Sequence, residues 1–323
     1  MKDYRIQEFG AVGDGVTMNT QAIQQAIDTA AADGGGRVVI TEGTFKTGSI
    51  QLRSYVELED VTMVNQPSGW SYWIHDCDFV QVRGLNILAD VNYPNNDGLH
   101  INCSRYVTVS DCNMTCGDDC IIIRANSVSL KENKPCEQVT ITNCNLTSYS
   151  AAVRIGWDND GVIRNCTLSN LVIKDSSVGF SFLIPGRMRK PFTLENSSGS
   201  DVGREATLIE NLTFSNIIMD KQCSYPVFVS LADNDYTHIA AVRNLHFSHL
   251  HSRGPEFPYL QGKPDCPIEN VTFSDCTFEV TDGSEFDNRA SHGPIQVKDL
   301  EYHPMHVRHV KNLHFNNTEF TVC

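Results

Sequence analysis

The sequence contains no long hydrophobic run. Its apolar segments fall far short of the ~18 residues that a membrane-spanning helix requires, so a helical membrane protein is excluded. Apolar residues are nevertheless plentiful, with 41% hydrophobic and 20% charged residues in a chain of 323. That balance is typical of globular proteins and excludes a disordered chain. The length allows one large domain or two of medium size.

Positive charge is also scarce. The 25 Lys and Arg residues face 39 Asp and Glu residues, which gives a formal net charge of −14. The sequence offers no basic stripe to phosphates, which argues against nucleic acid as a partner. It also lacks a phosphate-binding glycine loop, a Cys-x-x-Cys zinc pattern and a nucleophilic Ser-His constellation.

Residues 1–9 show no apolar core region and no small-residue cleavage site, the two marks of a signal peptide. Among the twelve cysteines, Cys112, Cys144, Cys166 and Cys276 each close a similar short phrase. A residue that recurs at one place in a repeat is expected to be an inward-facing small hydrophobe rather than half of a disulfide. Because reduced thiols favour the cytoplasm, we expect a cytoplasmic protein, or a secreted one whose signal peptide has been removed.

The short phrase recurs along the chain and alternates apolar and polar residues, as in Val-Thr-Val-Ser-Asp-Cys at 107–112. Its copies begin at residues 80, 107, 139, 161, 212, 245, 271 and 313. The shortest interval, 22 residues, fits one coil of a solenoid, and longer intervals fit a coil with a loop. The interval of 51 residues between 161 and 212 fits two coils. The alternation and the β-branched residues predict strands with one buried face.

Asn and Asp follow these strands, where they tolerate the left-handed backbone of tight turns. A single segment has a helical pattern: Asn19 or Thr20 caps it, Gly34–Gly36 ends it, and its apolar stripe comprises Ala22, Ile23, Ala26, Ile27 and Ala30. Such a helix is suited to cover the open first coil. We therefore predict an all-β right-handed parallel β-helix with an N-terminal capping helix, forming a single domain over residues 1–323. A β-sandwich would require hairpin turns such as Asn-Gly, which are scarce.

Two acidic motifs are separated by 21 residues, close to one coil: one contains Asp97 and the other Asp118 and Asp119. Since stacked coils lie ~4.8 Å apart, we expect the three carboxylates to meet. Crowded like charges raise the pKa of a carboxyl, which then serves as a general acid while the others deprotonate a water. This is the equipment for hydrolysing a glycosidic bond with inversion. An Asp-rich turn and a calcium site are the alternatives, but the pair opens a wall strand.

These residues resemble glycoside hydrolase family 28, the polygalacturonase-like enzymes. The family's Asn-Thr-Asp motif matches Asn95-Asn96-Asp97, and its Gly-Asp-Asp motif with the following Cys matches residues 117–120. Residues 9–16, 19–27 and 34–45 are similar to its opening, and the resemblance extends over about residues 5–185. It implies that Asp118 is the general acid and that Asp97 and Asp119 bind and activate water.

The chain departs from the family at two motifs. The Gly-His-Gly stretch is matched by residues 150–157, with Ala151 at the histidine position and Arg154 at the serine position. The Arg-Ile-Lys motif, which grips the substrate carboxylate in the family, is matched by Ser181-Phe182-Leu183, without positive charge. Arg187, Arg189 and Lys190 lie just beyond it. We therefore expect a neutral sugar beside the acids, unless Arg154 has taken over the charge.

The expected substrate-binding residues are Asn95, His100, Arg154, Trp157 and Arg187. Strand alternation points Arg154 toward the acids, where it would contact a substrate oxygen or hold a catalytic carboxylate ionised; a surface salt bridge is the alternative. Trp157 would stack on a sugar face or pack in a loop. His100 matches a family position held by Asp or His and would support the catalytic residues from behind.

Together these features predict an inverting glycosidase that acts on pectin-derived or related plant oligosaccharides without a metal or cofactor. The site would be exo-acting and closed by loops such as residues 185–191. Two rivals remain. One is a polysaccharide lyase or epimerase that uses Arg154 as its base, and the other is an inactive carbohydrate-binding relative.

Overall fold

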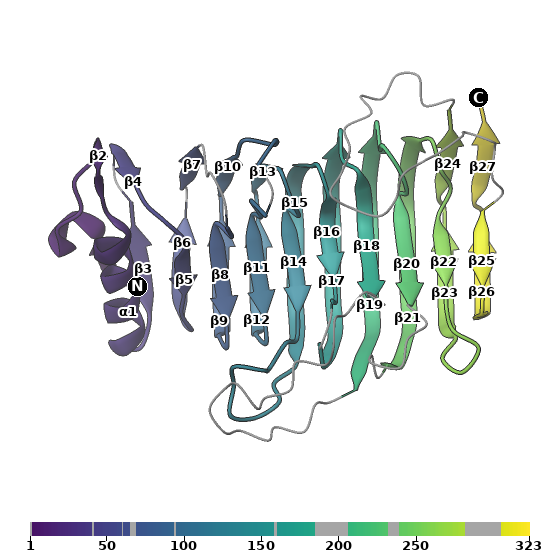
Figure 1. The fold of residues 1–323 in the computed structure, drawn as a ribbon, viewed down its shortest axis with the longest axis horizontal. Helices are drawn as coiled ribbons and strands as arrows, with labels where there is room; N and C mark the ends of the chain where they lie inside the picture. Colours follow the sequence, from purple (N-terminus) through teal and green to yellow (C-terminus); the bar gives the residue numbers. More distant parts are fainter. Residues whose placement is uncertain are drawn as a thin grey trace.

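The computed structural model describes residues 2–40, 42–59, 61–64, 69–93, 95–157, 160–184, 206–231, 239–281 and 305–323. In this part of the chain the strands stack side by side from the N-terminal end to the C-terminal end, in the order of the sequence (Figure 1). Every strand pairing is parallel, and the coils wind into the right-handed parallel β-helix that the repeats predicted.

The larger sheet has sixteen strands. Its main path runs through β1 (Asp3–Arg5), β3 (Gly36–Val39), β6 (Val56–Glu59), β9 (Asp78–Arg83), β12 (Arg105–Ser110), β15 (Cys136–Ser148), β17 (Val162–Lys174), β19 (Thr207–Asp220), β21 (Ile239–Gly254), β23 (Ile268–Ser274) and β26 (Val310–Asn316). Beside this path lie β7 (Thr62–Val64), β10 (Asn86–Leu88), β13 (Asn113–Cys116), β24 (Thr277–Val280) and β27 (Glu319–Val322).

The second sheet has nine strands and carries the residues of interest for function. In spatial order they are β5 (Ile50–Leu52), β8 (Tyr72–His75), β11 (Leu99–Asn102), β14 (Ile121–Arg124), β16 (Ala151–Ile155), β18 (Val178–Ile184), β20 (Val227–Leu231), β22 (Tyr259–Gln261) and β25 (His306–Arg308). A separate pair is formed by β2 (Asp14–Met18) and β4 (Thr44–Lys46).

The strand register confirms the repeat phrases, with one correction. Val80, Val107 and Val139 lie opposite one another, as do Leu212, Leu245, Val271 and Leu313. The phrase at 161–166 is shifted, because it is Cys166 and not Gly161 that lies opposite Leu212. β17 pairs directly with β19, so the interval that was assigned two coils is a single coil. The phrase misled because an Asn-Cys pair occurs at two different corners of the coil.

Asparagines mark one of these corners, as the sequence predicted. Asn165, Asn211, Asn244, Asn270 and Asn312 all have left-handed backbone, with φ between 55° and 58°. Each side-chain amide donates to the carbonyl oxygen of the asparagine one coil earlier, at 2.8–3.0 Å. Asn tolerates this conformation better than most residues, and the stack satisfies its amide at the same time.

The interior between the sheets is apolar and tightly stacked. Phe214, Phe247 and Phe273 are fully buried, with consecutive ring centroids 4.6 and 4.9 Å apart. All twelve cysteines are free thiols, and Cys112 and Cys144 stack inside as expected. Cys166 is also buried but belongs to the neighbouring column. Disulfides therefore take no part in this fold; close packing of the stacked side chains stabilises it.

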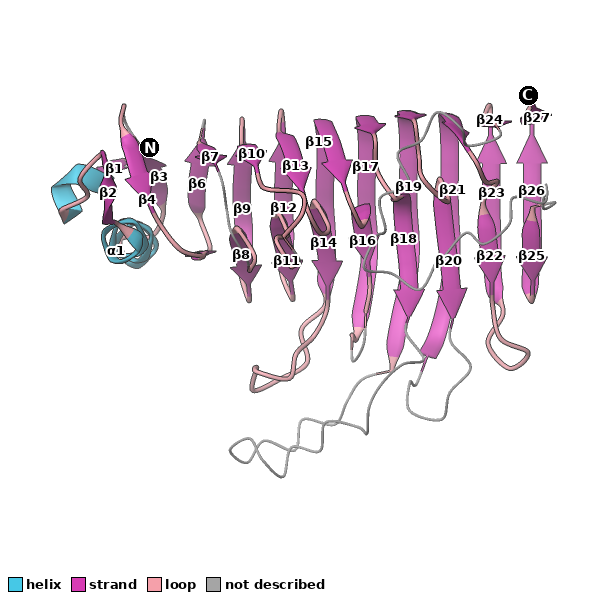
Figure 2. Ribbon diagram, turned by 45° about the horizontal axis from the view of Figure 1, so that its top comes forward, coloured by secondary structure: helices cyan, strands magenta, loops and turns pink. Residues whose placement is uncertain are grey.

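The helix α1 (Thr20–Ala32) covers the first coil, as predicted (Figures 1 and 2). Its buried face consists of Ile23, Ala26, Ile27 and Ala30, which join the main core. Asn19 stands at the N-cap, yet its side chain bonds residues 12 and 17 rather than the helix. A one-turn helix η1 (Ile6–Phe9) precedes α1. Among the described residues, no helix has the length and apolar character needed to cross a bilayer.

Candidate active site

The two acidic motifs lie on adjacent coils. Asp97 precedes β11 and Asp118-Asp119 precedes β14, and these strands are paired with Leu99 opposite Ile121. The backbone N–H of Gly98 donates to the carbonyl oxygen of Asp119 at 2.9 Å. A Cβ atom at Gly98 would lie 2.3 Å from the carbonyl oxygen of Cys120. Only glycine therefore lets the two coils approach this closely, which brings the acids together.

Asn96 fastens the two motifs, a role that the sequence analysis missed. Its side chain is fully buried, and its Oδ1 accepts the backbone N–H of Gly117 at 2.7 Å. Its Nδ2 donates to the carbonyl oxygen of Asp90 at 2.8 Å. The signal was the motif itself, since the asparagine immediately before Asp97 is a polar residue in an otherwise buried run.

Asp97 is bonded to His100. The His100 Nε2 and the Asp97 Oδ2 are 2.6 Å apart, and the residues are 5% and 6% exposed. Burial, together with the charge of Asp119, raises the pKa of Asp97 to about 8. Burial lowers the pKa of His100 to about 3, so the imidazole is neutral at physiological pH. The pair therefore holds its proton without forming an ion pair.

Trp70 completes this side of the site and had no signal in the sequence. Its ring stacks on His100, with centroids 3.8 Å apart and planes 15° apart. The indole is 39% exposed. His100 is thus held between the carboxyl of Asp97 and an aromatic face that reaches solvent.

Asp118 is the more accessible of the paired aspartates. Its Oδ1 accepts the backbone N–H of Asp119 at 3.0 Å, and its carbonyl oxygen accepts the hydroxyl of Ser148 at 2.7 Å. Burial, followed by the charges of Asp119 and Asp97, raises its pKa to about 6. A carboxyl with such a pKa keeps a useful protonated fraction near neutral pH, as a general acid requires.

Asp119 is paired with Arg154. The Arg154 Nε contacts the Asp119 Oδ2, and Nη2 lies 3.1 Å from Oδ1. The backbone N–H of Ala151 also donates to Oδ1, at 2.9 Å. Arg154 comes from β16 and points toward the acids, as strand alternation predicted, with a side chain only 14% exposed. The guanidinium thus neutralises one of the three carboxylates.

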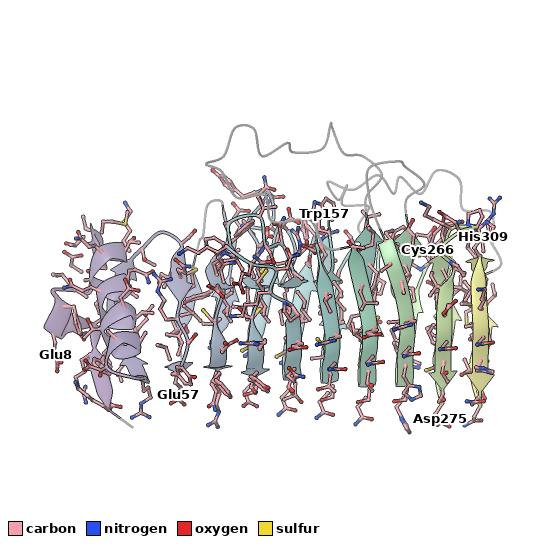
Figure 3. All side chains as sticks on the ribbon, turned by 90° about the horizontal axis from the view of Figure 1, so that it is seen from below. Glu8, Glu57, Trp157, Cys266, Asp275 and His309 are labelled. Atoms are coloured by element: carbon pink, nitrogen blue, oxygen red, sulfur yellow. The ribbon has the colours of Figure 1, made fainter. Side chains whose placement is uncertain are left out.

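The other expected binding residues are placed unevenly. The guanidinium of Arg154 lies 4.6 Å from the ring centroid of Trp157, so one face of that indole is occupied. Trp157 lies on the long side of the β-helix opposite Glu57 and Asp275 (Figure 3). Asn95 is exposed, with a left-handed backbone of φ 55°. Arg187, and with it the loop at residues 185–191, lies outside the described residues.

The wall beyond Arg154 carries no cation where the family has its Arg-Ile-Lys motif. Ser181 lies opposite Arg154 in β18, Phe182 points into the core and Leu183 faces outward. A small apolar cluster covers this outer face, formed by Ala151, Val178 and Phe228 with Leu183, Tyr225 and Tyr259 packed against it. The surface next to the acids is therefore uncharged over two coils.

Metal binding was weighed as an alternative use of the acids. In the described part of the chain, no group of three or more His, Cys, Asp or Glu side chains is arranged to hold a metal ion. At Asp119 the position beside the carboxylate is taken by the guanidinium of Arg154.

Comparisons with known proteins agree with the motifs. Residues 49–133 match the model of Glycosyl hydrolases family 28, and residues 4–59 match that of Rhamnogalacturonase A/epimerase, pectate lyase-like. A probable polygalacturonase of Arabidopsis thaliana is 25% identical over 226 residues, covering 65% of this chain and 44% of the relative. A mannuronan C5-epimerase of Azotobacter vinelandii is 36% identical over 81 residues, covering 21% of this chain and 6% of the relative.

The chain spans less than half the length of the curated relatives that it matches. Among solved structures, a family 28 exopolygalacturonase of Yersinia enterocolitica aligns with a TM-score of 0.62 at 14% identity, covering 99% of this chain and 75% of that one. That likeness shows the fold. With the paired acidic motifs and the family match across them, the chain belongs to the polygalacturonase-like glycoside hydrolase family 28, as a divergent member without the Gly-His-Gly and Arg-Ile-Lys motifs.

Proposed function

We propose that this protein is an inverting glycoside hydrolase that acts on pectin-derived or related plant oligosaccharides. The observation that carries the proposal is the meeting of three carboxylates from two adjacent coils, two of them with raised pKa values. The third is matched by an arginine. Buried like charges are unfavourable to hold together, and such clusters occur where proton transfer uses them.

In this mechanism Asp97 and Asp118 share one proton near neutral pH. Because the two groups are coupled, the raised pKa values describe the pair as a whole. Asp118 is the more exposed of the two and gives its proton to the leaving oxygen of the scissile bond. Asp97 and Asp119 then hold and deprotonate the water that attacks from the other side of the sugar.

The sugar unit beside the acids is uncharged in this proposal. The outer surface at Ser181 and Leu183 has no cation, and its neighbours are apolar or aromatic. A carboxylate buried there without a charged partner would cost several kcal/mol, of the order of ~2–5. Arg154 is already engaged with Asp119, so it is not free to receive a uronate.

Exo action is part of the same proposal. The exopolygalacturonase title belongs to the Yersinia protein, and only its fold is shared at this level of identity. The test is product analysis: the protein is incubated with defined neutral and acidic pectic oligosaccharides, and the anomer of the first product is read by NMR. Release of terminal units with inverted anomeric configuration is expected. Internal cleavage of long polygalacturonate, or retention, would contradict exo action or inversion respectively.

A lyase or epimerase reaction is the second candidate, and the match to mannuronan C5-epimerases favours it. Either reaction requires a base that removes the proton next to a uronate carboxylate. Arg154 does not suit that task, because the charge of Asp119 raises its pKa above the usual arginine value. Ultraviolet absorbance decides between elimination and hydrolysis, since only elimination creates a conjugated double bond. An inactive binding relative would release no product of either kind.

A further inference from the structure

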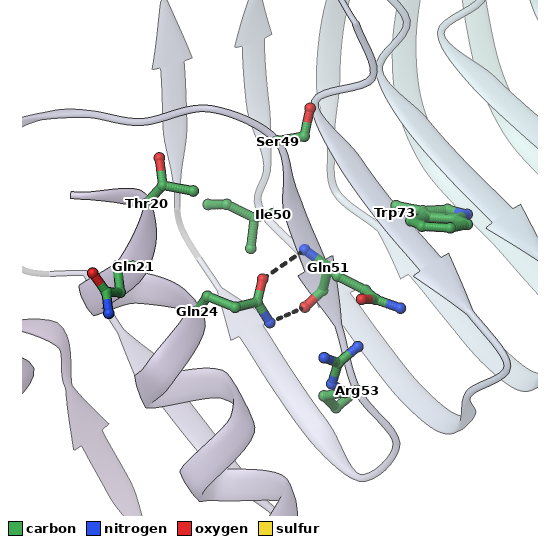
Figure 4. A pocket seen from close by; sticks show the side chains of 8 residues that line it. All are labelled: Thr20, Gln21, Gln24, Ser49, Ile50, Gln51, Arg53 and Trp73. Atoms are coloured by element: carbon green, nitrogen blue, oxygen red, sulfur yellow. Dashed lines mark hydrogen bonds between the residues drawn. The ribbon is translucent and has the colours of Figure 1, made fainter. Parts of the chain in front are cut away.

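A pocket of about 530 Å³ lies at the N-terminal end of the nine-stranded sheet, away from the acids (Figure 4). Helix α1 forms one side of it and strands β5 and β8 form the other. Its lining residues are Thr20, Gln21, Gln24, Ser49, Ile50, Gln51, Arg53 and Trp73. The volume is within the usual range for small-molecule sites, and the proposed reaction gives this pocket no role.

The pocket is connected to the acids by the strand register. Gln51 lies opposite Trp73, and Trp73 lies opposite His100, the partner of Asp97. With strands ~4.8 Å apart, Gln51 is two strands, or ~10 Å, from His100. Trp70 bridges the interval, because it stacks on His100 and meets the Trp73 ring edge-on at 5.8 Å between centroids. An elongated ligand lying along this column passes from the acids to the pocket over aromatic side chains.

The walls of the pocket are held in place. The side-chain amide of Gln24 on α1 accepts the backbone N–H of Gln51 at 2.9 Å and donates to its carbonyl oxygen at 2.8 Å (Figure 4). The hydroxyl of Thr20 accepts the backbone N–H of Gly48 at 2.7 Å. These bonds fasten the helix to the first strand of the sheet, so the pocket is formed before any ligand arrives.

The chemistry of the lining suits an uncharged polyol. The side-chain amides of Gln21 and Gln51 bond no other residue in the part of the chain that the structure describes, and each offers donors and an acceptor. The charge of Arg53 is matched by Asp28 at 2.8 Å. Trp73 adds an indole, whose face packs against the C–H face of a sugar ring.

We propose that this pocket is a distal subsite that binds an uncharged sugar unit of the oligosaccharide whose cleavage occurs at the acids. The inference rests on the proposed function, and it adds that the substrate extends along the column of Gln51, Trp73 and His100 toward α1. Affinity then depends on chain length, because only oligosaccharides long enough to reach from the acids to the pocket gain its contacts.

The experiment measures binding by calorimetry to the Asp118→Asn variant of the full chain, which removes turnover. The probes are defined neutral pectic oligosaccharides and oligogalacturonides, each from disaccharide to hexasaccharide. Affinity for the neutral series is expected to rise at least ~10-fold at the length that reaches the pocket. Adding Gln21→Ala and Gln51→Ala should remove that gain and leave disaccharide affinity unchanged. Gln25→Ala, on the same helix but outside the pocket, is the matched control.

A plateau of affinity at the disaccharide, an equal loss from the Gln25→Ala control, or no binding of any probe overturns the subsite. A stronger length effect for oligogalacturonides than for neutral probes overturns its uncharged character. Turnover by the wild type is measured in parallel, so the two proposals fail separately. Length-dependent binding without any hydrolysis contradicts the proposed reaction alone, and hydrolysis that is independent of chain length contradicts the subsite alone.

Discussion

Arg154 binds Asp119 through two of its guanidinium nitrogens, one coil away from the residue that it contacts. Asp97, on the other side of Asp119, has no such partner and is bonded to the neutral imidazole of His100 instead. The cluster therefore divides its charge unequally. One carboxylate is matched by a cation, whereas the remaining two compete for a proton because burial and mutual repulsion disfavour their charges.

Replacing Asp118 with Asn should lower kcat/KM at least ~10²-fold, because the leaving oxygen then loses its proton donor. Asp111→Asn is the control: Asp111 is exposed, lies on the same coil and has a left-handed backbone that Asn accepts. Steady-state rates on the best oligosaccharide check the result. Near-normal activity of the Asp118 variant would remove that residue from the mechanism.

Arg154→Ala should lower activity on neutral and acidic substrates to the same extent, by at least ~10-fold. The reason is that Asp119 loses its counter-charge while Asp97 and Asp118 remain beside it. Rates on a matched neutral glycoside and uronide measure the ratio. If the variant loses only the uronide activity, Arg154 has replaced the missing Arg-Ile-Lys motif and the neutral-sugar proposal is wrong.

The rate should depend on pH as a bell. The reaction requires one proton on the pair of Asp97 and Asp118, whose pKa values are raised to about 8 and about 6. Below about 6 the pair becomes doubly protonated and loses its base, and above about 8 it loses its acid. A profile of kcat/KM from pH 4 to pH 10 checks both limbs. Activity that keeps rising through pH 10 would exclude a carboxylic acid as proton donor.

Asp97→Asn should stabilise the folded protein at pH 8. The folded-state pKa of Asp97 is about 8 against a model value of 3.8, so its contribution to stability is fully present below about pH 4. It is lost as the pH rises toward 8, because the unfolded chain then binds fewer protons than the folded one. Asn cannot ionise and escapes that loss. We expect a Tm increase of at least ~2 °C at pH 8 and none at pH 4, measured by thermal unfolding; equal shifts at both values would assign the effect to packing instead.

Native thiol labelling should be confined mainly to Cys323. This cysteine is exposed, whereas ten of the others are buried and Cys223 is half-buried. Burial also raises the pKa of thiols such as Cys77 and Cys103, to about 11 and about 12, which lowers their reactivity further. Mass spectrometry after alkylation, with and without denaturant, counts the reactive thiols. Fewer than twelve labelled thiols in denaturant without reductant would reveal disulfides.

The sequence by itself determined the architecture, since the recurring Val-Thr-Val-Ser type of phrase encodes one buried strand face in every coil. It also determined that Asp97 and Asp118 come close, because their separation is nearly one coil and adjacent coils are only a strand spacing apart. The helical stripe from Ile23 to Ala30 is local and periodic, so it too was legible in the sequence. In each of these cases the deciding interaction is short-range or repeats along the chain.

Only the tertiary structure decided the coil register after residue 161 and the partners of the acids. Asn-Cys pairs occur at two corners of the coil, and the sequence does not distinguish between them, whereas the pairing of β17 with β19 does. Trp70 on His100, Asn96 on Gly117 and the pocket between α1 and β5 join residues from different coils or elements. Their contacts depend on how far each coil is rotated and on which side chain faces outward. Those quantities are fixed by the packing of the whole stack rather than by any local pattern of residues.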